Sequence, residues 1–167
     1  MPHSFDVSTG SPASVEQIHA AFGREDYWLD RVAADDADTT LDWMIVDADG
    51  TVKVRATQHL GRRLLPALVA RLIPGDLRIV HNETWSPIGG GQVRGEVSVA
   101  ARGAPGSGLG VALLAPAQNG SRLKCTVTVE FKVPLVGGKI ESFIGRQVVE
   151  QIADVQRFTT KWITEHA

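Results

Sequence analysis

The stretch RLKCTVTVEFKVPLVGGKIESFIGRQVVEQIADVQRFTTKWI, residues 122–163, contains the two clearest periodicities of the chain. Up to Val133, apolar and polar residues alternate, which predicts a strand with one buried and one solvated face, as in an antiparallel sheet. After Pro134 and a glycine pair the period changes, and apolar residues recur every three or four positions as far as Trp162. This spacing predicts a long amphipathic helix over about residues 139–165.

Upstream of this stretch, period-two alternation runs through most of the chain from about residue 41, which predicts a series of antiparallel strands. Asp49-Gly50 and Asn119-Gly120 fall between alternating segments and are typical of tight hairpin turns. In the first of these strands Leu41, Trp43 and Ile45 alternate. The strand over residues 77–85 carries on one parity Leu77, Ile79, His81, Glu83 and Trp85. The alternation leaves open which parity of this strand faces inward.

The N-terminal part of the chain predicts a short strand followed by two short helices. Phe5 and Val7 alternate within the strand. Ser14 and Gln17 have the spacing of a capping box at the start of the first helix, and Gly23 is placed to end it. The second helical segment covers about residues 25–34, so both helices precede the main run of strands.

This order of elements predicts an α+β fold and a single domain over residues 1–167, with a curved antiparallel sheet wrapped around the long C-terminal helix. Such an arrangement leaves a space between sheet and helix, and the small residues Ala56, Gly95 and Ala100 fill little of it. We therefore expect a pocket lined by alternate strand residues and one helix face. A solid core without a cavity is the alternative that the pattern allows.

Composition excludes several other classes of protein. The chain has 167 residues, a mass of 17.9 kDa and a net charge of −2, which predicts no general affinity for nucleic acid. The single cysteine, Cys125, excludes an internal disulfide and a multi-cysteine zinc site. Histidines and acidic residues form no ligand-like spacing, so we expect no metal and no cofactor. No apolar stretch approaches the ~20 residues of a membrane span, and no secretory signal is present, so a cytoplasmic protein is expected.

The order of elements and the segment at 129–163 resemble the START and birch-pollen-allergen (Bet v 1-like) superfamily, SRPBCC, which has the helix-grip fold. More narrowly, EDYWLDR at 25–31, ETW at 83–85 and PLVGGKIE at 134–141 are similar to an actinobacterial family within it. The resemblance covers essentially the whole chain. It implies the helix-grip fold and a ligand such as a lipid, sterol, polyketide or plant hormone, and some members of the superfamily are cyclases or hydrolases.

We expect the ligand to be an apolar small molecule, lipid-like or polyketide-like, held by apolar walls and oriented by a few polar groups. Eight residues of the sheet and the C-terminal helix are the candidate ligand-binding residues. They are Trp43, His81, Glu83, Trp85, Val127, Phe143, Gln147 and Gln151.

Two other functions remain open from the sequence. In an enzyme of the cyclase or hydrolase kind, His81 or Glu83 would be the catalytic general base, because imidazole and carboxylate groups can accept a proton. A protein-interaction module without an open cavity is the third possibility. The oligomeric state is not predicted.

The segment LLPALVARLI, residues 64–73, interrupts the strands and predicts a short helix. Arg62, Arg63 and Arg71 accompany its leucines, and a basic amphipathic segment of this kind can make transient contact with a membrane. Packing of the same leucines into the core explains the pattern equally well.

Overall fold

The computed structural model describes residues 2–35, 37–61, 63, 65, 67–72 and 75–167. Within these residues, seven strands and four helices follow one another. They are β1 (His3–Ser11), α1 (Val15–Phe22), α2 (Glu25–Ala33), β2 (Asp38–Val46), β3 (Val52–Leu60), α3 (Ala67–Ala70), β4 (Leu77–Gly89), β5 (Gln92–Arg102), β6 (Gly106–Ala117), β7 (Gly120–Phe131) and α4 (Gly137–Glu165).

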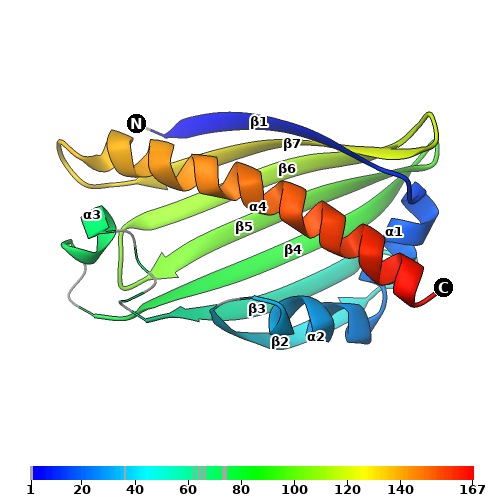
Figure 1. The fold of residues 1–167 in the computed structure, drawn as a ribbon, viewed down its shortest axis with the longest axis horizontal. Coiled ribbons are helices and arrows are strands. Elements are labelled where there is room, and N and C mark those ends of the chain that lie inside the picture. The colour runs from blue at the N-terminus through cyan, green and yellow to red at the C-terminus, as the bar shows by residue number, and fades with distance from the viewer. Residues whose placement is uncertain (1, 36, 62, 64, 66, 73–74) are drawn as a thin grey trace.

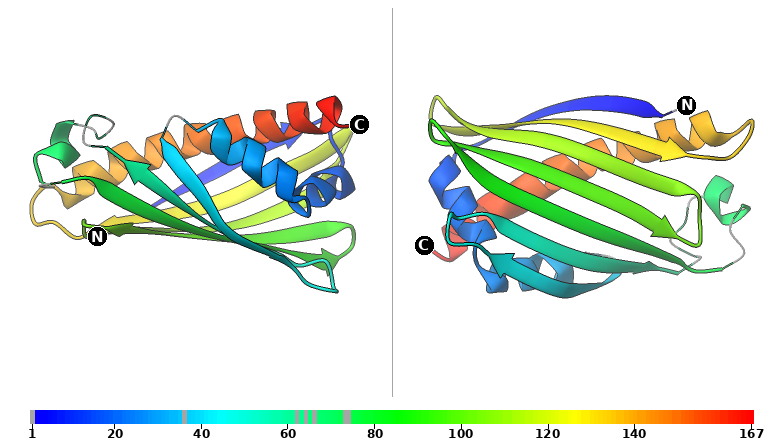
Figure 2. Two further views of the ribbon diagram at one scale, coloured as in Figure 1. Left: turned by 90° about the horizontal axis from the view of Figure 1, so that it is seen from below. Right: turned by 180° about the vertical axis from the view of Figure 1, so that it is seen from behind.

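The strands form one curved sheet in the order β1-β7-β6-β5-β4-β3-β2, and all neighbouring strands are antiparallel. From β2 to β6, each strand pairs with the strand that follows it in the sequence, and β1 pairs with β7. Helix α4 crosses one face of the sheet diagonally. Helices α1 and α2 lie on the same face, near the C-terminal end of α4 (Figures 1 and 2). The α+β architecture predicted from the sequence is confirmed.

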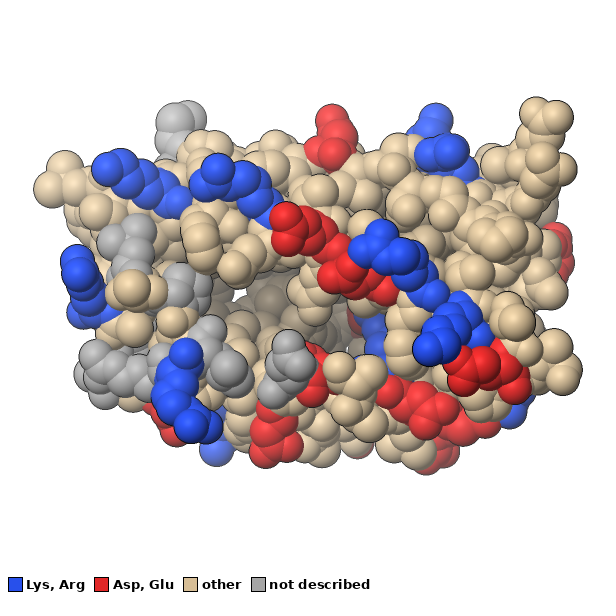
Figure 3. Space-filling model, viewed as in Figure 1, with Lys and Arg blue, Asp and Glu red and all other residues tan. Residues whose placement is uncertain are grey.

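The sheet and α4 do not meet along the whole of their length. Helix α4 packs mainly on β1 and β7. Figure 3 shows the surface hollowed between α4 and the part of the sheet that carries β2 and β3. Among the described residues, no helix is both long enough and apolar enough to cross a membrane.

Local sequence signals explain how the N-terminal helices begin. The Ser14 side chain accepts a hydrogen bond from the Gln17 amide at 3.1 Å, and the Gln17 side chain accepts one from the Ser14 amide at 2.8 Å. The predicted capping box is therefore present. The helix expected over residues 64–73 is found as α3, which has four residues. Arg62 and residues 64, 66, 73 and 74 lie outside the described residues, and with them part of the segment for which membrane contact is expected.

A β-bulge in β2 changes the direction of the residues that follow it. The pairing with β3 shifts between Leu41, which is opposite Ala56, and Trp43, which is opposite Arg55. One extra residue in a strand exchanges its two faces. Trp43 therefore lies on the outer face of the sheet and is 41% exposed, so its prediction as a pocket residue is wrong. Met44 takes the inward position and packs against the core.

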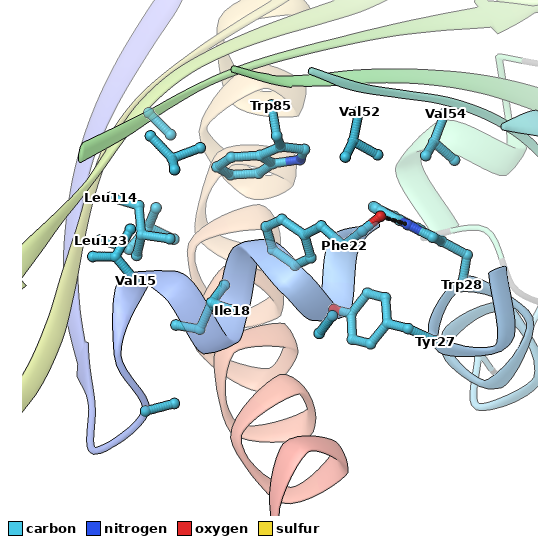
Figure 4. Close-up of a cluster of buried hydrophobic side chains, with 14 of the residues drawn as sticks. Val15, Ile18, Phe22, Tyr27, Trp28, Val52, Val54, Trp85, Leu114 and Leu123 are labelled. Carbon is cyan, nitrogen blue, oxygen red and sulfur yellow. Dashed lines mark hydrogen bonds between the residues drawn. The ribbon is translucent and has the colours of Figure 1, made fainter. Parts of the chain in front are cut away.

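The main hydrophobic core lies where α1, α2 and the C-terminal half of α4 meet the sheet. Figure 4 shows Phe22 of α1 between Trp85 of β4 and Tyr27 of α2. A Cβ atom on Gly95 would lie 2.4 Å from the ring of Trp85. The space expected at Gly95 is thus filled by the indole, and Ala100 is exposed on the outer face. Of the three small residues, Ala56 borders open space.

A second, smaller core lies at the opposite end of the sheet. Its buried members come from β4, β7, α4 and the segment around α3. They are Leu65, Val69, Leu77, Phe131 and Ile140. The cavity described below lies beside the main core, with which it shares Trp28 and Val54.

Candidate functional site

A cavity of about 360 Å³ lies between α2, α4 and strands β2 to β4. Its volume is at the lower end of the range for small-molecule sites, roughly 300–1,000 Å³. Its walls are formed by residues that are far apart in the sequence. They are Trp28, Arg31, Val32, Ala34, Asp35, Thr39, Val54, Ala56, His81, Glu83, Gln151, Asp154, Val155 and Phe158.

Apolar and polar groups contribute separate parts of this lining. Val54 and Ala56 come from β3, and Val155 and Phe158 from α4. The ionisable groups come mainly from α2 and β4, where Arg31 and Glu83 meet. Seven of the fourteen lining residues are apolar and seven are polar or ionisable, so this cavity is more polar than most small-molecule binding sites.

Arg31 and Glu83 form the charged pair of the cavity. Arg31 Nη2 donates to Glu83 Oε2 at 3.3 Å, and the side chains are 22% and 12% exposed, respectively. Glu83 Oε1 also accepts a hydrogen bond from the Trp85 indole at 3.1 Å. The Arg31 guanidinium lies over the ring of Trp28, 4.8 Å from its centroid, in cation–π geometry. These contacts fix the positions of both charged groups.

The charge of Arg31 is retained in spite of its burial. Burial alone would lower the pKa of Arg31, but the charge of Glu83, together with Tyr27 and Asp35, raises it above its ordinary value. The guanidinium is therefore cationic near neutral pH.

A hydrogen-bonded chain of polar side chains positions His81. Asp35 Oδ2 accepts from the Gln58 amide at 3.0 Å, which places Gln58 Oε1 toward His81 Nε2 at 3.4 Å. This arrangement favours the tautomer in which Nε2 carries the proton and Nδ1 does not. Burial lowers the pKa of His81, and the charge of Arg31 acts in the same direction, against the opposing effect of Glu83. The imidazole is therefore neutral near pH 7 and can accept a proton or a hydrogen bond at Nδ1.

Tyr27 lies behind the cavity wall and is fully buried. Thr159 donates its hydroxyl proton to the Val155 carbonyl at 2.8 Å, so in the 2.6 Å contact between Tyr27 and Thr159 the phenol is the donor. Burial raises the pKa of Tyr27. The phenol is therefore neutral, and its oxygen keeps lone pairs that can accept a hydrogen bond.

The candidate residues from the sequence fall in different places. His81, Glu83 and Gln151 line the cavity, and Trp85 lies in the adjoining core with its indole directed to Glu83. Three others lie outside the lining. Val127 is buried on the inner face of β7. Phe143 and Gln147 are exposed on α4, N-terminal to Gln151, which is the first residue of α4 in the cavity lining.

Sequence reasoning missed Arg31, Asp35 and Phe158 as residues of the site. The sequence did contain a signal for Arg31. Trp28 and Arg31 are three positions apart in EDYWLDR and therefore share one face of a helix. Asp35 lies just beyond that helix, and its contact with Gln58 depends on the pairing of β2 with β3. Nothing in the local sequence indicates that contact.

A second depression, of about 510 Å³, lies at the connection between β7 and α4 and is lined by residues 131–135, 137 and 138. All of these belong to one continuous segment, with Lys132 as the ionisable member. It is remote from the ionisable cluster around Arg31. Among the described residues, no three His, Cys, Asp or Glu side chains form a group that could hold a metal ion.

Comparison with known proteins places the chain in a family. A family model described as "Protein of unknown function (DUF2505)" matches residues 6–163. The chain belongs to the DUF2505 family. An uncharacterized protein of Mycobacterium tuberculosis is 38% identical to this DUF2505 member over 173 residues, covering 99% of each chain.

Solved structures share the fold of this DUF2505 chain at low sequence identity. Ara h 8.0201 aligns with a TM-score of 0.58 and 15% identity over 99% of both chains. A Thalictrum norcoclaurine synthase aligns with a TM-score of 0.54 and 13% identity, over 99% of this chain and 96% of that one. The DUF2505 chain therefore has the Bet v 1-like fold, and the resemblance predicted from the sequence is confirmed.

Proposed function

We propose that this protein binds an apolar small molecule in the cavity between α2, α4 and strands β2 to β4. The observation that carries the proposal is the cavity itself, about 360 Å³ in volume, with Trp28, Val54, Val155 and Phe158 among its lining residues. Burying apolar ligand surface contributes roughly 25 cal/mol per Å². The apolar wall supplies affinity, and the cluster around Arg31 orients the ligand.

The fold supports this proposal without specifying the ligand. The resemblance to the Bet v 1-like superfamily implies small-molecule binding between sheet and C-terminal helix. The cavity of this chain occupies that place, on the side of α4 that faces β3 and β4. Arg31 and Glu83 are held by each other, and Glu83 also by Trp85, so these two groups are in place before a ligand arrives.

The test uses N-phenyl-1-naphthylamine, an uncharged aromatic dye whose fluorescence rises in an apolar site. We expect saturable binding to the wild-type protein. Ala56→Phe places a ring in the cavity and is expected to weaken binding at least tenfold. Ala100→Phe is the matched control, because Ala100 is exposed on the outer face of the same sheet. It is expected to bind the dye as the wild type does.

A second variant keeps the test valid if Ala56→Phe does not fold. Gln151 lines the cavity but is exposed, so Gln151→Trp narrows the entrance without overpacking the interior. Folding of each variant is checked by circular dichroism. Undiminished dye binding by both folded cavity variants, or no binding by the wild type, would show that the proposal is wrong.

A further inference from the structure

We infer that the polar group of the ligand is an uncharged oxygen acceptor, such as a ketone or amide carbonyl, and that the guanidinium of Arg31 donates hydrogen bonds to it. This inference rests on the proposed function, because it specifies the chemistry of the molecule that occupies the same cavity. It is carried by three features of the site: the fixed position of Arg31, the acceptors available to it, and the charges around it.

The guanidinium is held in place from two directions. The ring of Trp28 lies against its face, 4.8 Å from Arg31 Cζ, and Glu83 binds Nη2 at 3.3 Å. Glu83 is itself fixed by the Trp85 indole. Because the Arg31 side chain is already held in place, little of its conformational entropy is lost when a ligand binds.

The protein groups beside Arg31 satisfy only part of its donor capacity. A guanidinium has five N–H groups. Glu83 accepts from one of them, and the Tyr27 oxygen can accept from a second, because its own proton is directed to Thr159. Arg31 lines the cavity, so its remaining N–H groups can be reached from there. The Arg31 side chain is 22% exposed, so these N–H groups are open to water in the empty cavity. A ligand that displaces this water must replace its hydrogen bonds to Arg31, and an oxygen acceptor does so.

The charges around Arg31 favour an uncharged acceptor over an anion. Asp35 and Glu83 line the cavity with Arg31, so these three groups together carry one negative charge. His81 is neutral near pH 7, and Asp154 is bonded to Arg157. An anionic ligand would add to a local excess of negative charge in a place of low dielectric constant.

The carboxylates of the site do not favour a cationic ligand either. Glu83 already accepts from Trp85 and Arg31. Asp35 accepts from the amide of Ala37, the hydroxyl of Thr39 and the side chain of Gln58. Every oxygen of the two carboxylates thus accepts at least one hydrogen bond from the protein, and a cationic ligand would also be repelled by the charge of Arg31, which retains donors. A neutral oxygen acceptor is the group that matches both conditions.

The experiment compares three dyes that share a naphthalene ring. N-phenyl-1-naphthylamine has no oxygen. Prodan carries a ketone whose hydrogen bonding shifts its emission to longer wavelength. 8-Anilino-1-naphthalenesulfonate is the first dye with an added sulfonate. Binding of the first dye tests the proposed function, and differences among the three test the present inference.

Two variants measure the contribution of Arg31 separately from that of its partner Glu83. Removing Arg31 alone would leave Glu83 buried without its cation, which is strongly destabilising. Arg31→Met is therefore combined with Glu83→Gln, and Glu83→Gln alone is the control. Because the control leaves Arg31 without its anion, folding of both variants is checked by circular dichroism before binding is measured. The glutamine keeps an oxygen that can accept from Trp85, and the control keeps Arg31.

We expect the double variant to bind Prodan at least tenfold more weakly than Glu83→Gln and to shift the emission of the bound dye to shorter wavelength. The double variant should bind N-phenyl-1-naphthylamine at least as tightly as Glu83→Gln does, because this dye has no oxygen acceptor for Arg31 and methionine adds apolar surface to the cavity. The sulfonate dye should bind the wild type more weakly than its uncharged parent at low salt.

Equal Prodan affinity and emission in the two variants would overturn the inference and leave the proposed function intact. Tighter, Arg31-dependent binding of the sulfonate dye would also overturn it, because the polar group would then be anionic. If the wild type bound none of the dyes, the proposed function would fail first.

Discussion

At the level of single residues, Glu141 joins three segments that are far apart in the sequence. Its side chain is fully buried, accepts from the Phe131 amide at 2.8 Å, and contacts His3 Nδ1 at 2.7 Å. It therefore links the start of α4 to the end of β7 and to β1. Burial alone would raise the pKa of Glu141, but the two hydrogen bonds and the charge of His3 lower it below its ordinary value.

A lowered pKa for Glu141 means that the ionised carboxylate stabilises the fold. This contribution is complete above the pKa of the unfolded chain, about 4.3 for glutamate, and is lost as the pH falls through the lower pKa of the folded state. We expect Glu141→Gln to destabilise the protein by about 1–3 kcal/mol at pH 7. The difference from the wild type should shrink below about pH 4.

Urea unfolding at a series of pH values measures this effect. Glu130→Gln, which alters a partly exposed carboxylate on the neighbouring strand, is the control and should have a much smaller effect at pH 7. If Glu141→Gln left the stability at pH 7 unchanged, Glu141 would not have the role assigned to it.

At the level of elements, the docking of α4 on β1 depends on Gly145. A Cβ atom at this position would lie 2.0 Å from Cε2 of Phe5, so only a residue without a side chain lets the helix approach the strand so closely. Gly138 is in the same helix, and a Cβ there would meet His3 Cε1 at an ordinary 3.5 Å. Substitution of Gly145 therefore tests close packing against β1, whereas substitution of Gly138 tests mainly the helix propensity of the residue.

We expect Gly145→Ala to destabilise the protein by about 1–3 kcal/mol, because the ring of Phe5 must move. Gly138→Ala should be neutral or stabilising by up to about 1 kcal/mol, because alanine is the better helix former. Thermal unfolding followed by circular dichroism distinguishes the two variants. Equal effects would show that α4 can shift on β1 without loss.

Elements were predicted well where one period dominated the sequence, and less well where pairing with a neighbour decided the geometry. The alternation before Val133 and the helical spacing after Gly137 predicted β7 and α4. In β2 the same reasoning failed, because the bulge before Trp43 depends on the register with β3. The donor and acceptor contacts of Arg31 and Asp35 likewise come from other elements, so their roles could not be inferred from periodicity.

At the level of the whole molecule, the cavity exists only when distant segments are brought together. Trp28 and Arg31 of α2 face Val155 and Phe158 of α4 across it. The two helices are also joined directly, by the Tyr27 to Thr159 hydrogen bond and by the one at 2.8 Å from the Trp162 indole to Asp30. The unfolded chain has no such site, so a ligand of the cavity must stabilise the folded state.

This coupling predicts the size of a thermal shift. A ligand at 100 times its Kd stabilises the folded state by about 2.7 kcal/mol. For a chain of this size each kcal/mol raises Tm by roughly 2–4 °C, so N-phenyl-1-naphthylamine should raise it by about 5–10 °C. Scanning calorimetry should show this shift for the wild type and for Ala100→Phe. At the same dye concentration the shift for Ala56→Phe should be about half as large or smaller, because its Kd is expected to be at least tenfold higher. A dye that bound without raising Tm would be bound equally well by unfolded chains, and its site would not be the cavity that α2 and α4 close.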